Sequence, residues 1–182
     1  MKLCHYESGQ VLSALASVHP KPLLEDYLHA GQERGMKGLY FHEWLLTESR
    51  LSESGRVDAL EWCSFEPEVR FPGLASVFDP FERSGVDSVT GWTVFGLELV
   101  KQAPTSVAVL NQFKSHLYPS CWSGSYGLTL RAMLPIVDKL KELELPEVNQ
   151  WVEECRAELQ QRIGEELARD AEESRRESER FE

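Results

Sequence analysis

The stretch from Pro146 to Glu182 constrains the fold of this chain more than any other. Its apolar residues recur after four, three, four, four, four and four positions. Such spacings place side chains on one face of a helix, whereas a half-buried strand would alternate with a period of two. We therefore predict one long amphipathic helix, with Trp151 beside its apolar stripe. The stripe consists of Val148, Val152, Cys155, Leu159, Ile163, Leu167 and Ala171.

This helix is expected to pack on the rest of the chain rather than to form a long coiled coil. The stripe advances 23 residues in six steps, or about 3.8 residues per step, which exceeds the 3.5-residue period of a heptad seam. We predict that residues 146–182 dock on a helical body formed by residues 1–145, and that a polar tail from about residue 172 lies in solvent. Glutamate and arginine side chains four positions apart should pair on the outer face. The predicted pairs are Glu158 with Arg162, Glu165 with Arg169, and Glu172 with Arg176.

Further helical patterns occur within residues 1–145, where prolines and glycines separate them. Pro135 lies inside the last pattern and predicts a kink or a new helix start. Residues 93–97 would also pass for a buried strand, but no partner strand is recognisable nearby, so a helix is favoured there. The predicted fold is all-α, a compact domain of about seven or eight helices with a long charged helix at its end. The patterns cover residues 8–18, 22 to 31 or 35, 37–52, 86–102, 104–118 and 130–143.

Residues 55–86 interrupt these patterns with prolines, glycines and aromatic residues that follow no single period. Apart from a short helical turn near Leu74 to Phe78, we expect this aromatic-rich segment to be irregular. Long loops in compact domains are commonly functional. The main interpretation is that the aromatic side chains hold the segment against the helices. The alternative is that some of them are exposed at a partner-binding surface.

The charge balance excludes some classes of partner. The chain has 30 acidic and 19 basic residues and a net charge of −11. Nucleic-acid binding requires clustered lysine and arginine against phosphates, so no nucleic-acid partner is predicted. No apolar run of about 18 residues is present and no secretory signal pattern is recognisable, so we predict neither a membrane partner nor secretion. A cytoplasmic protein is expected, in which the four cysteines are free thiols.

The sequence contains no complete catalytic, metal or cofactor motif. Residues 123–127, Ser-Gly-Ser-Tyr-Gly, approach a nucleophile elbow, but no strand is predicted before them and no histidine follows. The His42-Glu43 pair lacks the second histidine four positions on that a metalloprotease helix requires. The five histidines show no ligand spacing with one another or with cysteine. We therefore predict no catalytic residue, no metal site and no cofactor.

These observations favour a binding protein. The leading hypothesis is a small acidic cytosolic protein that inhibits or regulates a protein partner with a basic surface, for example an immunity protein that neutralises a toxin. One alternative is an enzyme whose site is assembled around residues 116–127 from His116, Cys121 and Ser125. Another is a structural helical protein that forms homo-oligomers.

The stretch from Glu61 to Asp87 is the best candidate for the partner-binding surface. Its six acidic residues face two basic residues, Arg70 and Arg83. An acidic stretch that also carries aromatic side chains combines the charge and the apolar area that a basic partner would need. The predicted contact residues are Glu61, Glu66, Glu68, Asp79, Phe81, Glu82 and Asp87.

Overall fold

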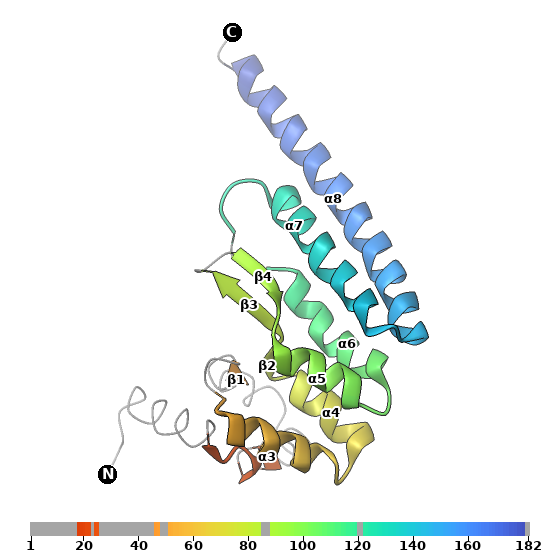
Figure 1. Cartoon of the computed structure of the whole chain (residues 1–182). Helices are drawn as coiled ribbons and strands as arrows, with labels where there is room; N and C mark the ends of the chain where they lie inside the picture. Colours follow the sequence, from red (N-terminus) through yellow and green to blue (C-terminus); the bar gives the residue numbers. More distant parts are fainter. Residues whose placement is uncertain are drawn as a thin grey trace, which may run out of the picture. The chain divides into compact units, whose positions relative to one another are not determined.

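The computed structural model describes residues 18–22, 24–25, 46–47, 51–84, 88–119 and 122–180. Over these residues the chain is mostly helical, with six α-helices and two small sheets of two strands each (Figure 1). The predicted helical class is therefore confirmed, but the count of seven or eight helices is too high for the described part, and all-α leaves out the strands. No helix there is both long enough and apolar enough to cross a membrane.

The chain divides into two compact units, which we describe separately. Unit 1 comprises Met1–Phe81 and Trp92–Phe113, and unit 2 comprises Glu82–Gly91 and Lys114–Glu182. The predicted arrangement, in which residues 146–182 dock on a body formed by residues 1–145, stays a prediction.

Helices α3 (Glu53–Cys63) and α4 (Pro67–Ala75) occupy most of the segment that was expected to be irregular. The Ser52 hydroxyl caps α3 by accepting a hydrogen bond from the Gly55 N–H at 3.1 Å. Pro67 stands in the first turn of α4, where a missing N–H costs nothing. The expectation of an irregular segment is thus wrong, because a proline can start a helix as well as end one.

Two short strand pairs also lie where helices or loops were expected. Strand β1 (Leu46–Thr47) pairs in parallel with β2 (Phe78–Asp79), which contradicts the predicted helix at these two residues; positions 37–45 and 48–50 lie outside the described residues. Strand β3 (Phe81–Ser84) pairs with β4 (Ser88–Trp92), so the helix predicted over 86–102 is wrong in its first half. The partner strand escaped recognition because three of the four β3 residues are exposed.

The second half of that stretch is helical, as predicted, and belongs to unit 1. Helix α5 (Val94–Gln102) begins at Thr93, whose hydroxyl accepts from the Gly96 N–H at 3.0 Å. The Thr93 N–H donates to the Pro80 carbonyl at 2.8 Å. A Cβ atom at Gly96 would come within 3.2 Å of the same oxygen. Glycine therefore allows residue 80 to lie directly against the first turn of α5.

Aromatic side chains form much of the core of unit 1. The rings of Phe78 and Phe95 meet edge to face with their centroids 5.1 Å apart. Phe81 packs on Trp92 at 4.7 Å, and Trp92 on Phe113 at 6.1 Å. Most aromatic residues of the segment 55–86 are thus buried, as the main interpretation expected. Helix α6 (Ser106–Phe113) lies within the predicted stretch 104–118 but is shorter, and it contributes Val109 and Leu110 to the buried residues.

Unit 2 is built on a pair of antiparallel helices. Helix α7 (Tyr126–Asp138) ends in the 3-10 turn η4 (Lys139–Leu143), and α8 (Pro146–Arg180) runs back along α7 and extends beyond its start (Figure 1). The predicted long helix is confirmed. Its stripe is buried from Val148 to Ile163, Leu167 is half-buried and Ala171 is exposed, so the stripe leaves the packed surface near residue 171.

A close backbone contact joins the two helices near the start of α7. A Cβ atom at Gly127 would lie 2.8 Å from Leu167 Cγ and 3.3 Å from the Leu167 backbone nitrogen. Helix α7 starts four residues earlier than predicted because the Ser125 hydroxyl caps it, accepting from the Leu128 N–H at 3.3 Å. The cap therefore extends α7 as far as the segment of α8 that contains Leu167.

The charged face of α8 differs from the predicted pattern of ion pairs. Of the three predicted pairs, Glu172 with Arg176 is present at 3.1 Å. Arg162 and Arg169 instead pair with Glu166, whose side chain is only 4% exposed. Glu158 pairs with Lys114 at 2.5 Å. The first two predictions are wrong because spacing along one helix reveals neither which carboxylate is buried nor which lysine comes from another element.

Candidate partner-binding surfaces

The structure distributes the predicted contact residues over both units. Glu61, Glu66 and Glu68 are exposed on α3, in the connecting turn and on α4, all in unit 1, whereas Glu82 is exposed on β3 in unit 2. Asp87 lies outside the described residues. Whether these carboxylates contact a partner stays a prediction.

Two of the predicted residues have roles within the fold. The Phe81 side chain is 4% exposed and packs on Trp92. Its ring therefore belongs to the core of unit 1, and the sequence pattern did not reveal this because the rest of its strand is polar. The Asp79 carboxylate accepts a hydrogen bond from the Phe81 N–H at 3.2 Å. Asp79 therefore stabilises the turn between β2 and β3.

Glu61 contributes to an acidic cavity of about 490 Å³ in unit 1, which we call the α3 groove. Two exposed valines stand among its carboxylates, with Val18 45% and Val57 62% exposed. Lys21 lies beside the groove, with its Nζ atom 3.1 Å from Asp58 and 2.7 Å from Glu61. The groove is lined by Val18, His19, Glu53, Ser54, Val57, Asp58 and Glu61.

Lys21 partly offsets the negative charge of the α3 groove. Hydrogen bonds to Glu61 and Asp58 raise the pKa of Lys21, so the lysine stays protonated throughout the physiological range. One ammonium group thus accompanies the carboxylates of Glu53, Asp58 and Glu61. The groove keeps a negative excess and an apolar centre, and both favour a basic ligand.

Arg70, from α4, is engaged within the fold next to this surface. Its guanidinium lies 2.8 Å from Glu25 and 3.2 Å from Glu66, and its carbon atom is 4.7 Å from the centre of the Trp62 ring. The Arg70 side chain is only 13% exposed. Its charge is therefore balanced by contacts inside unit 1. The apolar side chains of Phe65 and Val69 are exposed close to these acidic residues in the sequence.

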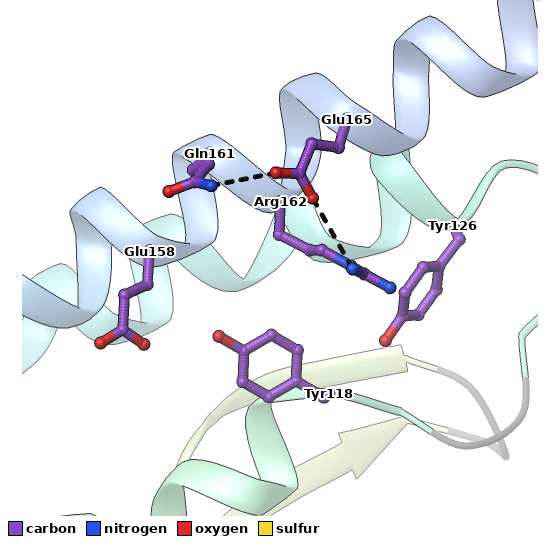
Figure 2. A pocket seen from close by; sticks show the side chains of 6 residues that line it. All are labelled: Tyr118, Tyr126, Glu158, Gln161, Arg162 and Glu165. Atoms are coloured by element: carbon purple, nitrogen blue, oxygen red, sulfur yellow. Dashed lines mark hydrogen bonds and ion pairs between the residues drawn. The ribbon is translucent and has the colours of Figure 1, made fainter.

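A second cavity, of about 480 Å³, lies in unit 2, and we call it the tyrosine cleft (Figure 2). Tyr118 and Tyr126 approach it from opposite the polar face of α8, and the Arg162 side chain extends between them. Trp122 stacks on Tyr126 with ring centroids 4.3 Å apart and is 47% exposed. The cleft is lined by Tyr118, Tyr126, Glu158, Gln161, Arg162 and Glu165.

The polar groups of the tyrosine cleft form a connected set. Gln161 donates to Glu165 at 3.0 Å, and Arg162 lies 3.6 Å from Glu165 and 2.9 Å from Glu166. Burial raises the pKa of Tyr118, so its phenol group stays protonated at neutral pH. The cleft was not predicted, because this face of α8 was interpreted as solvated and no pattern links residues 118 and 126 to it.

Of the residues proposed for an enzyme site, Ser125 has a structural role. Ser125 caps α7, and its hydroxyl donates to Asp170 at 2.5 Å. The 3-10 helix η3 (Lys114–Leu117), which contains His116, stands where a nucleophile elbow would need a strand. Cys121 lies outside the described residues. An enzyme site around residues 116–127 therefore stays a hypothesis without a supporting contact.

Two cysteines are described, and both are buried free thiols. Burial raises the pKa of Cys63 to about 12 and that of Cys155 to about 11. Thiols with such high pKa values are poor nucleophiles at neutral pH, because the thiolate is the reactive form. Within the described ranges, no three His, Cys, Asp or Glu side chains are grouped so that they could hold a metal ion.

The sequence and the structure were compared with known proteins. No family model matches the sequence, and neither the curated proteins nor the solved structures yield a match.

Proposed function

We propose that this protein binds a protein partner with a basic surface, and that the α3 groove is a principal contact site. The observation that carries the proposal is the composition of the groove, in which Glu53, Asp58 and Glu61 surround the exposed side chain of Val57. Interfaces commonly combine an apolar centre with a polar rim, and complementary charge accelerates the encounter of the two proteins. The net charge of −11 adds a long-range attraction for a cationic partner.

Binding of this kind would inhibit or regulate the partner by covering its basic surface. A cytoplasmic inhibitor that neutralises a toxin, as immunity proteins do, is one concrete form. The acidic rim would set the association rate and its salt dependence, while contacts of Val57 with apolar groups of the partner would slow dissociation. The hypotheses of an enzyme and of a structural homo-oligomer have no comparable support from the described residues.

The proposal is tested with a matched pair of charge variants. The groove variant is Glu53→Gln, Asp58→Asn, Glu61→Gln, and the control variant is Glu142→Gln, Glu147→Gln, Glu173→Gln, three exposed acids of unit 2. Both variants lose three negative charges, so a difference between them reports position rather than net charge. Circular dichroism and thermal unfolding would first establish that both are folded.

Wild-type protein and both variants are immobilised, and cytoplasmic extract of the source cells is applied at low and at high salt. We expect a basic protein that the wild type and the control variant retain at low salt, and that the groove variant loses by about tenfold or more. High salt should weaken its retention by the wild type. The proposal fails if the two triple variants retain the same proteins in equal amounts.

A further inference from the structure

We propose that the tyrosine cleft of unit 2 binds the guanidinium group of an arginine side chain in a peptide or protein ligand. The inference goes beyond the α3 groove, because it concerns a different cavity in a different unit. It rests on the charges, the aromatic walls and the size of the cleft, which lead to the same ligand class.

The charges of the cleft favour a cation. Two carboxylates, Glu158 and Glu165, line it together with one cation, Arg162. Arg162 is already engaged, because Glu166 holds its Nη2 atom at 2.9 Å and Glu166 is almost fully buried. An incoming anion would therefore meet two carboxylates and an arginine whose charge is already balanced.

The two carboxylates have acceptor capacity left for a ligand. Glu158 contacts Lys114 through one oxygen, at 2.5 Å, and Glu165 accepts from Gln161 at 3.0 Å through one oxygen while its other oxygen lies 3.6 Å from Arg162. A carboxylate has two oxygens and about four lone-pair directions. An arginine side chain carries five N–H donors in a planar arrangement that matches a carboxylate, so it can bond to one of these two groups.

The aromatic walls distinguish arginine from lysine. Tyr118 and Tyr126 line the cleft (Figure 2), and the exposed Trp122 ring packs on Tyr126 with the ring centroids 4.3 Å apart. A planar guanidinium stacks on aromatic rings and gains cation–π attraction, whereas an ammonium group is more strongly hydrated. Tryptophan, tyrosine and arginine are also the residues that dominate binding energy at protein interfaces.

The size of the cleft indicates that the arginine belongs to a peptide. Its volume of about 480 Å³ falls in the range of sites that take a drug-sized ligand. A single guanidinium group would leave most of this space to water. The hydroxyl and amide groups of Tyr118, Tyr126 and Gln161 can bond to the backbone on either side of the arginine.

Capped tripeptides are the probes, and protein NMR titration is the readout. The Gly-Arg-Gly peptide is compared with Gly-Lys-Gly and with Gly-citrulline-Gly, which keeps the shape of arginine but has no charge. Inorganic phosphate serves as the anionic probe. We expect saturable shifts with the arginine peptide that include the indole signal of Trp122, assigned with a Trp122→Phe variant. Affinity should fall by about tenfold for the citrulline peptide and by less for lysine.

Two double variants separate this cleft from general acidity. Glu158→Gln, Glu165→Gln should weaken the arginine peptide by about tenfold, whereas Glu153→Gln, Glu154→Gln, which changes exposed acids of the same helix, should leave it unchanged. The groove variant of unit 1 should also leave it unchanged, so loss of the proposed partner and loss of this site are separate results. Equal binding of the citrulline peptide, tighter binding of phosphate, or no saturable binding of the arginine peptide would each overturn the inference.

Discussion

The α3 groove and the tyrosine cleft are cavities of nearly equal volume that rest on different kinds of support. The groove lies on α3, and the same helix places Trp62 in the core of unit 1. The cleft lies between aromatic side chains and α8, which comes close to the backbone of α7 at Gly127 in addition to its buried stripe. Truncation of a buried side chain should therefore destabilise the helix that forms the groove. A side chain added at a close helix–helix contact should destabilise the helices that form the cleft.

The largest expected effect is on the support of the groove. Trp62→Ala removes a side chain that is 2% exposed, whose indole N–H donates to Glu25 at 2.8 Å. We expect a loss of about 3–5 kcal/mol in the free energy of unfolding, measured by urea denaturation. Val57→Ala, on the exposed face of the same helix, should change it by less than about 0.5 kcal/mol. Similar losses for the two variants would show that α3 is not anchored through Trp62.

Thiol reactivity provides a second comparison of the two units. Cys63 in α3 has a pKa of about 12 and Cys155 in α8 one of about 11, against an ordinary value of 9.0. Because the raised pKa lowers the thiolate fraction at pH 8, iodoacetamide should modify Cys63 about a thousandfold and Cys155 about a hundredfold more slowly than in the unfolded chain.

Peptide-resolved mass spectrometry of the native protein would measure both rates. Each rate should rise about tenfold per pH unit between pH 8 and pH 10 without levelling off, because this range lies below the raised pKa of both thiols. Rates that already level off near pH 9 would show that the two thiols titrate as if they were exposed.

Two glycines test the support of the cleft. Gly127→Ala places a Cβ atom 2.8 Å from Leu167 Cγ and 3.3 Å from a backbone nitrogen, so the helices must separate. We expect unit 2 to lose about 1–3 kcal/mol in thermal unfolding. Gly164→Ala meets no atom within 4 Å and should gain up to about 1 kcal/mol, because alanine is the better helix former. Stabilisation by both changes would exclude a close contact at Gly127.

Features that depend on neighbouring residues could be predicted from the sequence, whereas features that depend on tertiary packing could not. The stripe of α8 was predicted because period and helix formation are properties of neighbouring residues, as are the prolines at positions 104 and 119 that bound the predicted stretch containing α6. Helices α3 and α4 were missed because their prolines were interpreted as interruptions, whereas Pro67 starts α4 and Pro72 lies inside it.

The tyrosine cleft lay beyond sequence reasoning for a related reason. Tyr118 follows η3, Tyr126 begins α7 and Glu158 lies on α8, and only tertiary packing brings them around one cavity. Glu166 shows the same limit, because no pattern in the sequence distinguished it from its charged neighbours, whereas the fold buries it between Arg162 and Arg169. Part of the α3 groove was predicted from the sequence, since Glu61 was among the predicted contact residues.

The smallest expected effect is at the end of α8, beyond its packed part, where neither buried side chains nor a close helix–helix contact hold the helix. Glu172 pairs with Arg176 at 3.1 Å and with Arg175 at 2.8 Å, and all three side chains are at least 43% exposed. Glu172→Gln should therefore cost at most about 0.5 kcal/mol in thermal unfolding at low salt, and less at high salt, where screening weakens exposed ion pairs. A larger loss that persists at high salt would mean that the end of α8 packs against something, and the boundary between its docked and solvated parts would then lie beyond residue 172.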